Sequence, residues 1–333
     1  MQNFVPCTGE EDRTVNEDIG EAGVSPAVKP SLTTRMTLEE MKTELLDRES
    51  KMKAGCVHGE TDQWRVYQHI VLSIQRGEYL RLMVQASAGT GKSYLLTTVY
   101  LWCIVHGKKT KAAAPTGIAA ANIEVEGTDV CANTIHTVFD LDTEFKTKLD
   151  LAKLNNTKVR DLMSLEILLL DEVSMMDIDC WKTIVNLLSD VDHNRRAIAR
   201  DNDPFGYMHV ILFGDFKQLP PATSKAPFIV DPAVKDSFEF RVLRQNRRVV
   251  TGDASRTEEL EEFHRVLSDI SLGKATQRVR DFFVKAYVRG ARIGNANHVD
   301  FEGNTSVFSK RRYRDRWNNT VVNRIAKVII LKY

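Results

Sequence analysis

The chain has 333 residues, which is long enough for one large domain or two modest ones. Its 46 basic residues nearly balance its 45 acidic ones, and with 43% hydrophobic residues its composition is that of a soluble globular protein. Its five scattered cysteines argue against a disulfide framework and a zinc site, and its longest uncharged run, residues 93–105, is too short to span a bilayer.

The first 60 residues divide into two segments. Residues 1–34 carry six acidic and two basic side chains without apolar periodicity, so we expect a disordered acidic tail. Residues 35–60 are expected to form a helical lead-in or linker, in which Leu38, Met41 and Leu45 are spaced as on one helix face. Periodicity alone leaves open whether this helix packs on the rest of the chain.

From Trp64 onward, apolar strands alternate with helical stretches. The expected strands are residues 79–85, 111–114, 165–170 and 209–214, and residues 93–105 are an expected helix. Near-continuous apolar strands joined by helices indicate an α/β fold, a parallel sheet with helices on both faces. We expect this first domain to cover residues 61–239.

A second unit is expected over residues 240–333. Helical patterns at 257–271 and 276–288 precede a strand-like segment at 305–309. Residues 305–333 carry eight basic side chains and one acidic one, and such a basic end can meet nucleic acid.

Residues 82–93 have the pattern of a phosphate-binding loop, in which an apolar run leads into a glycine-rich turn. The residues that would face a bound nucleotide are Gly89, Thr90, Gly91, Lys92 and Ser93. The backbone N–H groups of such a turn and of the following helix point at phosphate oxygens. Lys92 would reach the β- and γ-phosphates of ATP, and Ser93 would ligate Mg²⁺. Ala86 replaces the first glycine of the usual pattern, and we expect the loop to tolerate it.

Two carboxylates, Asp171 and Glu172, directly follow the apolar run 165–170. The carboxyl edge of a parallel sheet is where α/β folds bind ligands, so the pair would lie beside the phosphate-binding loop. Asp171 would hold Mg²⁺ through water, and Glu172 would orient and deprotonate the attacking water. The alternative interpretation is a solvated pair that merely ends a strand.

Gln218 follows the strand at 209–214, within the segment Gly-Asp-Phe-Lys-Gln-Leu-Pro-Pro at 214–221. A neutral amide can donate to a γ-phosphate oxygen and accept from the lytic water. The alternative is a surface glutamine in a proline-terminated turn.

These segments together resemble the petite-integration-frequency (PIF) family of DNA helicases, in the 5′-to-3′ branch of superfamily 1. Besides the phosphate-binding loop, three segments carry the resemblance: Ala-Pro-Thr-Gly-Ile-Ala-Ala at 114–120, Thr-Ile-His at 134–136 and Asp-Glu-Val-Ser-Met at 171–175. The resemblance covers the chain from about Trp64 onward. It implies RecA-like domains, ATP and Mg²⁺ as cofactors, and single-stranded or forked DNA as the partner.

The resemblance also implies roles for individual residues. Thr116, Gly117 and His136 would contact DNA. Gln68 matches the glutamine that reads the adenine edge. Arg248 matches the arginine finger that acts from the second domain, and Arg247 is the alternative register.

The family's Gln-Gly-x-Thr and Ser-Arg segments do not occur before Tyr333, so we expect a chain cut within its second RecA-like domain. The function expected is ATP-driven 5′-to-3′ translocation and unwinding, in DNA repair, recombination or telomere maintenance. The alternative is a mobile-element remnant that binds ATP and nucleic acid without unwinding. We expect an intracellular protein, nuclear rather than mitochondrial because no transit peptide is seen.

Overall fold

The computed structural model describes residues 35–54, 61–152, 156–196, 205, 208–245, 247 and 254–292. The expected acidic tail at 1–34, the strand-like segment at 305–309 and Arg248 lie outside the described residues. Within these ranges, no helix combines the length and the apolar character that crossing a membrane requires.

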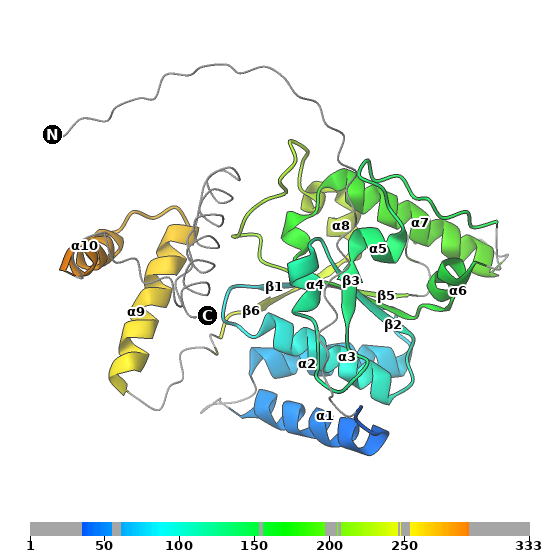
Figure 1. Ribbon diagram of the computed structural model, residues 1–333, viewed down its shortest axis with the longest axis horizontal. Coiled ribbons are helices and arrows are strands. Elements are labelled where there is room, and N and C mark those ends of the chain that lie inside the picture. The colour runs from blue at the N-terminus through cyan, green and yellow to red at the C-terminus, as the bar shows by residue number, and fades with distance from the viewer. Residues whose placement is uncertain are drawn as a thin grey trace, which may run out of the picture.

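Six parallel strands form one sheet at the centre of the molecule (Figure 1). From edge to edge they are β3 (Ala132–Thr134), β2 (Thr110–Ala114), β4 (Ile167–Leu170), β5 (His209–Gly214), β1 (Arg81–Ala86) and β6 (Glu239–Leu243). The inner strands β4 and β5 are buried along their whole length, as apolar strands between two helical layers must be. The expected α/β fold is confirmed.

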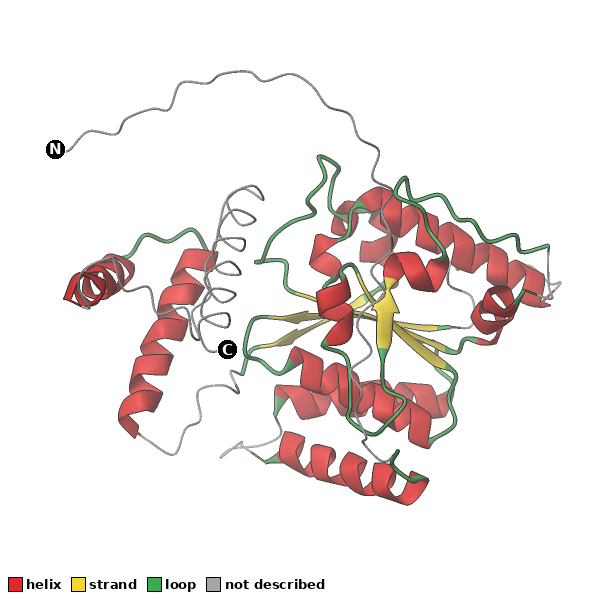
Figure 2. Ribbon diagram, viewed as in Figure 1, coloured by secondary structure: helices red, strands yellow, loops and turns green. Residues whose placement is uncertain are grey.

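Helices cover both faces of the sheet (Figure 2). One layer contains α1 (Leu38–Lys53), α2 (Asp62–Arg76) and α3 (Lys92–Val105). The other contains α5 (Ile135–Phe139), α6 (Thr157–Ser164), α7 (Ile178–Arg196) and α8 (Pro232–Ser237). Alternation along β1 divides the core between these layers, since Leu82 and Val84 pack with the first layer and Met83 with the second.

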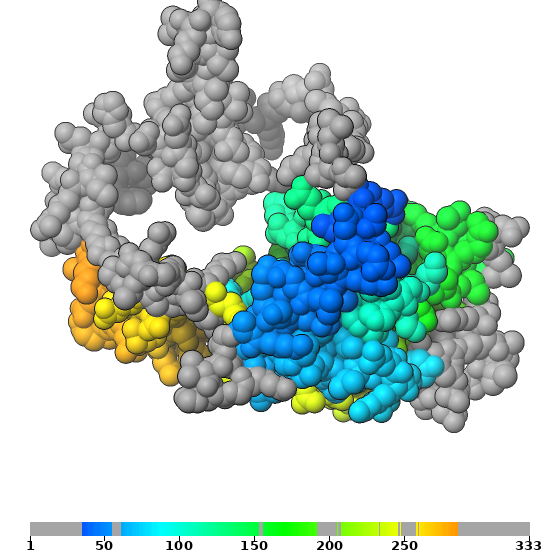
Figure 3. Space-filling view, turned by 90° about the horizontal axis from the view of Figure 1, so that it is seen from below, coloured from blue at the N-terminus to red at the C-terminus, as the bar shows by residue number. Residues whose placement is uncertain are grey.

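Helix α1 docks on the core, which answers the question that its periodicity left open. Met41, Leu45 and Met52 are buried, and α1 lies against α2 and α3 (Figure 3). At the polar margin of this contact, Arg48 pairs with Glu44 and donates to Thr97 Oγ1 of α3. The helical lead-in is therefore an outer layer of the nucleotide-binding unit rather than a free linker.

The sheet extends further than the sequence predicted. Strands β3 and β6 had not been expected, and β6 pairs with β1 from Leu82↔Glu239 to Ala86↔Leu243. The expected boundary between residues 239 and 240 therefore falls inside an edge strand, and it must be moved beyond Leu243. The reason is that residues 239–243 still belong to the first sheet, in which they form the edge strand beside β1.

Two helices follow β6, close to where helices were expected. They are α9 (Ala254–Ser271) and α10 (Gln277–Arg292), which contact one another through Phe263 and Phe282, with ring centroids 5.7 Å apart. They lie to one side of the sheet rather than over either of its faces (Figure 1).

Candidate active site

The phosphate-binding loop joins the carboxyl end of β1 to the start of α3, as predicted. Gly89 and Gly91 have φ angles of 84° and 81°, in the left-handed region that glycine adopts without strain. The buried Thr90 closes the turn, because its N–H and hydroxyl both donate to Ser87 O, over 3.2 and 2.8 Å. Ala86 is the buried last residue of β1 with negative φ, so the loop has no need of a glycine there.

A glutamine of α2 supports this loop from outside. Gln63 Nε2 donates to Gly91 O over 2.9 Å, and a Cβ added at Gly91 would lie only 2.5 Å from that nitrogen. Gln63 lies in the first turn of α2 after the N-cap at Thr61, and its contact with the loop was not expected from the sequence. Gln68 lies further along the same helix, and its role at the adenine edge stays a prediction.

Lys92 joins the loop to the predicted carboxylate pair. Its Nζ lies 2.8 Å from Asp171 Oδ1 and also contacts Glu172 Oε1. Burial raises the pKa of Asp171 above its usual value, and the charge of Lys92 offsets part of that rise. The structure thus brings together three of the residues that sequence analysis selected.

The backbone turns sharply at the carboxylate pair. Glu172 has φ 49° and ψ 36°, a left-handed conformation that is uncommon for a residue with a side chain. Its N–H donates to Asp171 Oδ1 over 2.8 Å, so the turn is stabilised by the neighbouring carboxylate. The Glu172 side chain stays 25% exposed, whereas that of Asp171 is 4% exposed, so Glu172 is the more accessible of the two to water.

The predicted Gln218 lies just beyond the end of β5. Its Nε2 donates to Asp215 Oδ2 over 3.2 Å, and its N–H donates to Asp215 O over 2.9 Å. Since β5 lies between β1 and β4, Gln218 emerges at the edge that carries the phosphate-binding loop and the carboxylates.

Arg247, the alternative arginine finger, is engaged in structural contacts. Its guanidinium donates to Met52 O and Ala54 O at the end of α1, over 2.8 and 2.9 Å, and its N–H donates to Gly89 O over 2.8 Å. Arg247 therefore lies beside the phosphate-binding loop, with its guanidinium held by the end of α1. Arg248 and the alternative Arg247 both stay predictions for the arginine finger.

The predicted DNA contacts lie beside one another at the same edge of the sheet. Strands β2 and β3 pair Ala114 with Thr134, and Thr116 and His136 each follow this pair by two residues. Thr116 caps α4 (Gly117–Ala121) by accepting the N–H of Ala119, and Gly117 is exposed. His136 is half-buried in α5. These placements suit a surface contact, and the roles themselves stay predictions.

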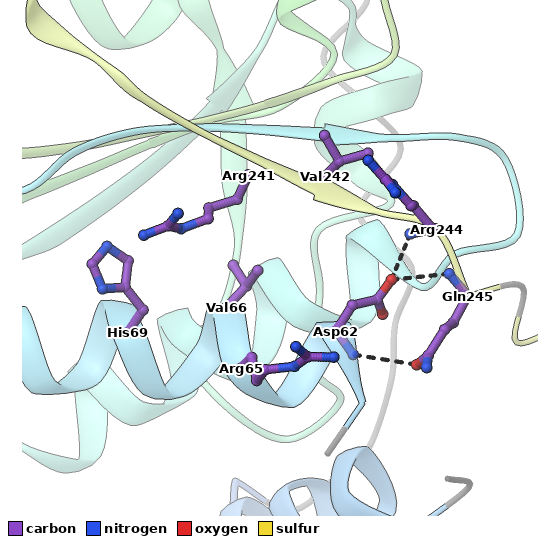
Figure 4. Close-up of a pocket in the computed structure, with 8 residues that line it drawn as sticks. All are labelled: Asp62, Arg65, Val66, His69, Arg241, Val242, Arg244 and Gln245. Atoms are coloured by element: carbon purple, nitrogen blue, oxygen red, sulfur yellow. Dashed lines mark hydrogen bonds between the residues drawn. The ribbon is translucent and has the colours of Figure 1, made fainter. Parts of the chain in front are cut away.

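A pocket of about 570 Å³ lies between α2 and β6 (Figure 4). At its end, Asp62 Oδ2 accepts the N–H groups of Arg244 and Gln245, and Gln245 Oε1 accepts the N–H of Asp62 over 3.2 Å. These bonds fasten the end of β6 to the first turn of α2, the turn that also carries Gln63.

The parallel sheet, its glycine-rich loop and the carboxylates beside Lys92 define a P-loop nucleoside triphosphatase with a RecA-like fold. A family model described as PIF1-like helicase matches residues 60–281. Because this match covers more than half of the chain, the chain belongs to the PIF1-like helicase family.

Curated relatives match over part of their length. The chain is 32% identical over 190 residues to the ATP-dependent DNA helicase RRM3 of Saccharomyces cerevisiae. This alignment covers 53% of the chain and 24% of the relative. It is 27% identical over 209 residues to human ATP-dependent DNA helicase PIF1, covering 61% of the chain and 27% of the relative. The chain therefore spans about a quarter of the length of these relatives.

Solved structures give the same assignment. A structure described as showing DNA unwinding at forked duplex DNA by two coordinating Pif1 helicases aligns with a TM-score of 0.50 and 29% identity, over 65% of this chain and 49% of that one. The Pif1 helicase of Candida albicans aligns with a TM-score of 0.57 and 23% identity, over 80% and 55% of the two chains, and supports the fold.

Proposed function

We propose that this chain is the ATP-binding part of a DNA helicase that couples ATP hydrolysis to 5′-to-3′ movement along single-stranded DNA. The observation that carries this proposal is the convergence of two sets of residues on one edge of the sheet. Lys92, Asp171 and Glu172 lie on the loops that follow β1 and β4, while Thr116 and His136 follow β2 and β3. A nucleotide and a DNA strand would then contact neighbouring loops.

The residues around Lys92 suit a magnesium nucleotide. The hydroxyl of Ser93 and the carboxylate of Asp171 are hard oxygen donors of the kind that Mg²⁺ prefers. Ser93 directly follows Lys92 in α3, and Asp171 Oδ1 lies 2.8 Å from Lys92 Nζ. Bound Mg²⁺ would neutralise charge on the phosphates. Ser93 and Asp171 would hold the ion, and Lys92 would turn from the carboxylates to the phosphates.

The hydrolytic water would be activated by Glu172. Its carboxylate is partly exposed at the edge of the site, whereas Asp171 is buried and suited to metal binding. Glu172 would accept a proton from the water, and Gln218 would orient that water toward the γ-phosphate. DNA repair, recombination and telomere maintenance, in the nucleus, are the processes in which we propose such an enzyme acts.

The test is a comparison of the chain with its Glu172→Gln variant. ATP turnover is measured with and without single-stranded DNA, and unwinding is measured on duplexes that carry a 5′ or a 3′ tail. In the full reading frame we expect DNA-stimulated turnover and unwinding from the 5′ tail only, both lost in the variant. Residues 1–333 alone, which span about a quarter of the length of the relatives, should bind ATP with weak, barely DNA-stimulated turnover and no strand separation. Unwinding from the 3′ tail would contradict the direction. Binding of ATP and DNA without turnover would favour a non-unwinding remnant.

A further inference from the structure

We propose that Gln85 is a positioning residue that holds Gln218 in place through Asp215, and that it thereby links the phosphate-binding strand to the group that orients the attacking water. The inference rests on the hydrolytic role proposed above for Gln218. Gln85 itself lies in β1, directly before Ala86 and the phosphate-binding loop.

The side-chain amide of Gln85 makes two complementary hydrogen bonds with the loop after β5. Its Nε2 donates to Asp215 Oδ1 over 2.7 Å, and its Oε1 accepts the N–H of Phe216 over 3.0 Å. Strand register makes this possible, because Gln85 pairs with Gly214, the last residue of β5. An amide supplies both a donor and an acceptor at this position, which a carboxylate or an alkyl chain cannot do.

Asp215 passes this contact on to Gln218. Its carboxylate is buried, with 4% of the residue exposed, and it accepts from three donors. These are Gln85 Nε2, the N–H of Lys217 over 3.1 Å and Gln218 Nε2 over 3.2 Å. A buried carboxylate must be satisfied by donors, so removing the Gln85 amide leaves Asp215 short of one and free to shift. Gln218 donates one hydrogen bond to the carboxylate of Asp215 and one to its backbone carbonyl, so it would shift together with Asp215.

The arrangement gives one rigid connection between two loops that must act on the same phosphate. The phosphate-binding loop starts at the end of β1, and the loop with Gln218 starts at the end of the neighbouring β5. Positioning residues of this kind act on turnover rather than on binding, since a misplacement of about 1 Å costs roughly 10²-fold in rate.

The test is a double-mutant cycle in the chain. Gln85→Met keeps the length of the side chain and removes both hydrogen bonds, and Gln218→Ala removes the group that Gln85 is inferred to position. We expect Gln85→Met to lower kcat by roughly 10- to 100-fold. In the Gln218→Ala background the same change should alter kcat by no more than about twofold, because the two residues act as one unit. Affinity for a non-hydrolysable Mg·ATP analogue should stay unchanged.

Two further variants make the result specific. Gln85→Glu keeps the acceptor but sets a second carboxylate against Asp215, so it should lower kcat at least as much as Gln85→Met. Lys111→Met removes a polar side chain from β2, away from Asp215, and should leave kcat unchanged. Thermal unfolding of each variant separates loss of positioning from loss of fold.

Each outcome has one meaning. Independent effects of Gln85→Met and Gln218→Ala on kcat would overturn the positioning role while leaving the proposed function intact. Loss of analogue binding in Gln85→Met would overturn it in favour of a role in the phosphate-binding loop. Normal turnover of Gln218→Ala would overturn both the hydrolytic role of Gln218 and the positioning role of Gln85. This outcome can be distinguished from the others by measuring the Gln218→Ala variant alone.

Discussion

Lys92 Nζ lies 2.8 Å from Asp171 Oδ1, so the cation of the phosphate-binding loop is the counter-ion of a buried carboxylate. Nucleotide phosphates would compete with Asp171 and Glu172 for the same ammonium. A magnesium nucleotide would resolve that competition, since Asp171 would then face the charge of the metal ion and Lys92 would be available to the phosphates.

Replacing Lys92 should weaken nucleotide binding strongly. Lys92→Ala removes the charge that contacts the phosphates, and loss of one charged hydrogen-bond partner corresponds to roughly 10- to 100-fold in affinity. Isothermal titration with Mg·ATP measures this, with the exposed Lys109→Ala as the control. Equal affinity in the two variants would contradict the assignment of the loop.

Replacing Glu172 should separate binding from hydrolysis. Glu172→Gln keeps the shape of the side chain and removes the base, so turnover should fall by about 10²–10⁴-fold while Mg·ATP still binds. Single-turnover kinetics and equilibrium binding measure the two effects. A variant that loses binding but retains turnover at saturating ATP would show that Glu172 is structural.

Gly91 should be less replaceable than other left-handed glycines. Alanine at Gly91 (φ 81°) or Gly107 (φ 65°) pays a similar conformational cost of about 1–2 kcal/mol. At Gly91 the new Cβ must also displace Gln63, whereas at Gly107 nothing lies within 4 Å. We expect both variants to lose stability in thermal unfolding, but only Gly91→Ala to lose nucleotide affinity. Equal nucleotide affinity in both would contradict the contact.

His209 should make the fold sensitive to acid. Burial lowers the pKa of His209 to about 4, and its Nδ1 accepts the N–H of Leu80, which requires the neutral ring. Between pH 6.5 and 4 the unfolded chain binds a proton that the folded chain does not, so unfolding free energy falls as pH falls. The loss is on the order of 2 kcal/mol for this group.

The control for this pH effect is His209→Gln, whose amide oxygen can accept the same N–H but does not titrate. Urea unfolding at several pH values should show a shallower dependence in the variant over pH 4–6.5. Identical slopes for the two proteins would mean that His209 titrates normally in the folded chain.

His136 should contribute one contact to single-stranded DNA. Loss of a single hydrogen bond, worth ~0.5–1.5 kcal/mol, should weaken binding by about 2- to 12-fold in His136→Ala. Fluorescence anisotropy at several salt concentrations measures this, and affinity should fall steeply with salt in both proteins. His106→Ala, at the far end of α3, is the control. Equal weakening by both changes would contradict a DNA contact at His136.

The strands that could be predicted are the four inner ones, β2, β4, β5 and β1, which are buried along most of their length. β4 is entirely apolar, β5 is apolar apart from His209 at its start, and helices cover both faces of these strands, so their sequences show the burial directly. β3 has only three residues, and β6 exposes four of its five residues at the edge of the sheet. Their strand conformation depends on pairing with β2 and β1, and the hydrophobic pattern of a short segment gives no information about such a partner.

The parts of the site that could be predicted are those in which one short segment contains both the functional residues and the strand and turn that position them. The phosphate-binding loop and the Asp171–Glu172 pair meet this condition, and the structure joins them through Lys92. Gln63 and Gln68 lie on the same helix, so their spacing alone did not show which of them faces the loop. The position of Gln63 just after the capping Thr61 was the available signal.

The contacts of Arg247 determine where the protein can be cut into separately produced fragments. A fragment that ends at residue 239 would lack the edge strand β6, the hydrogen bond to Gly89 and the guanidinium that closes the last turn of α1. Loss of those groups exposes one side of β1 and loosens the loop that follows it. A fragment intended for crystallisation or ligand screening should therefore start before α1 and continue past Arg247.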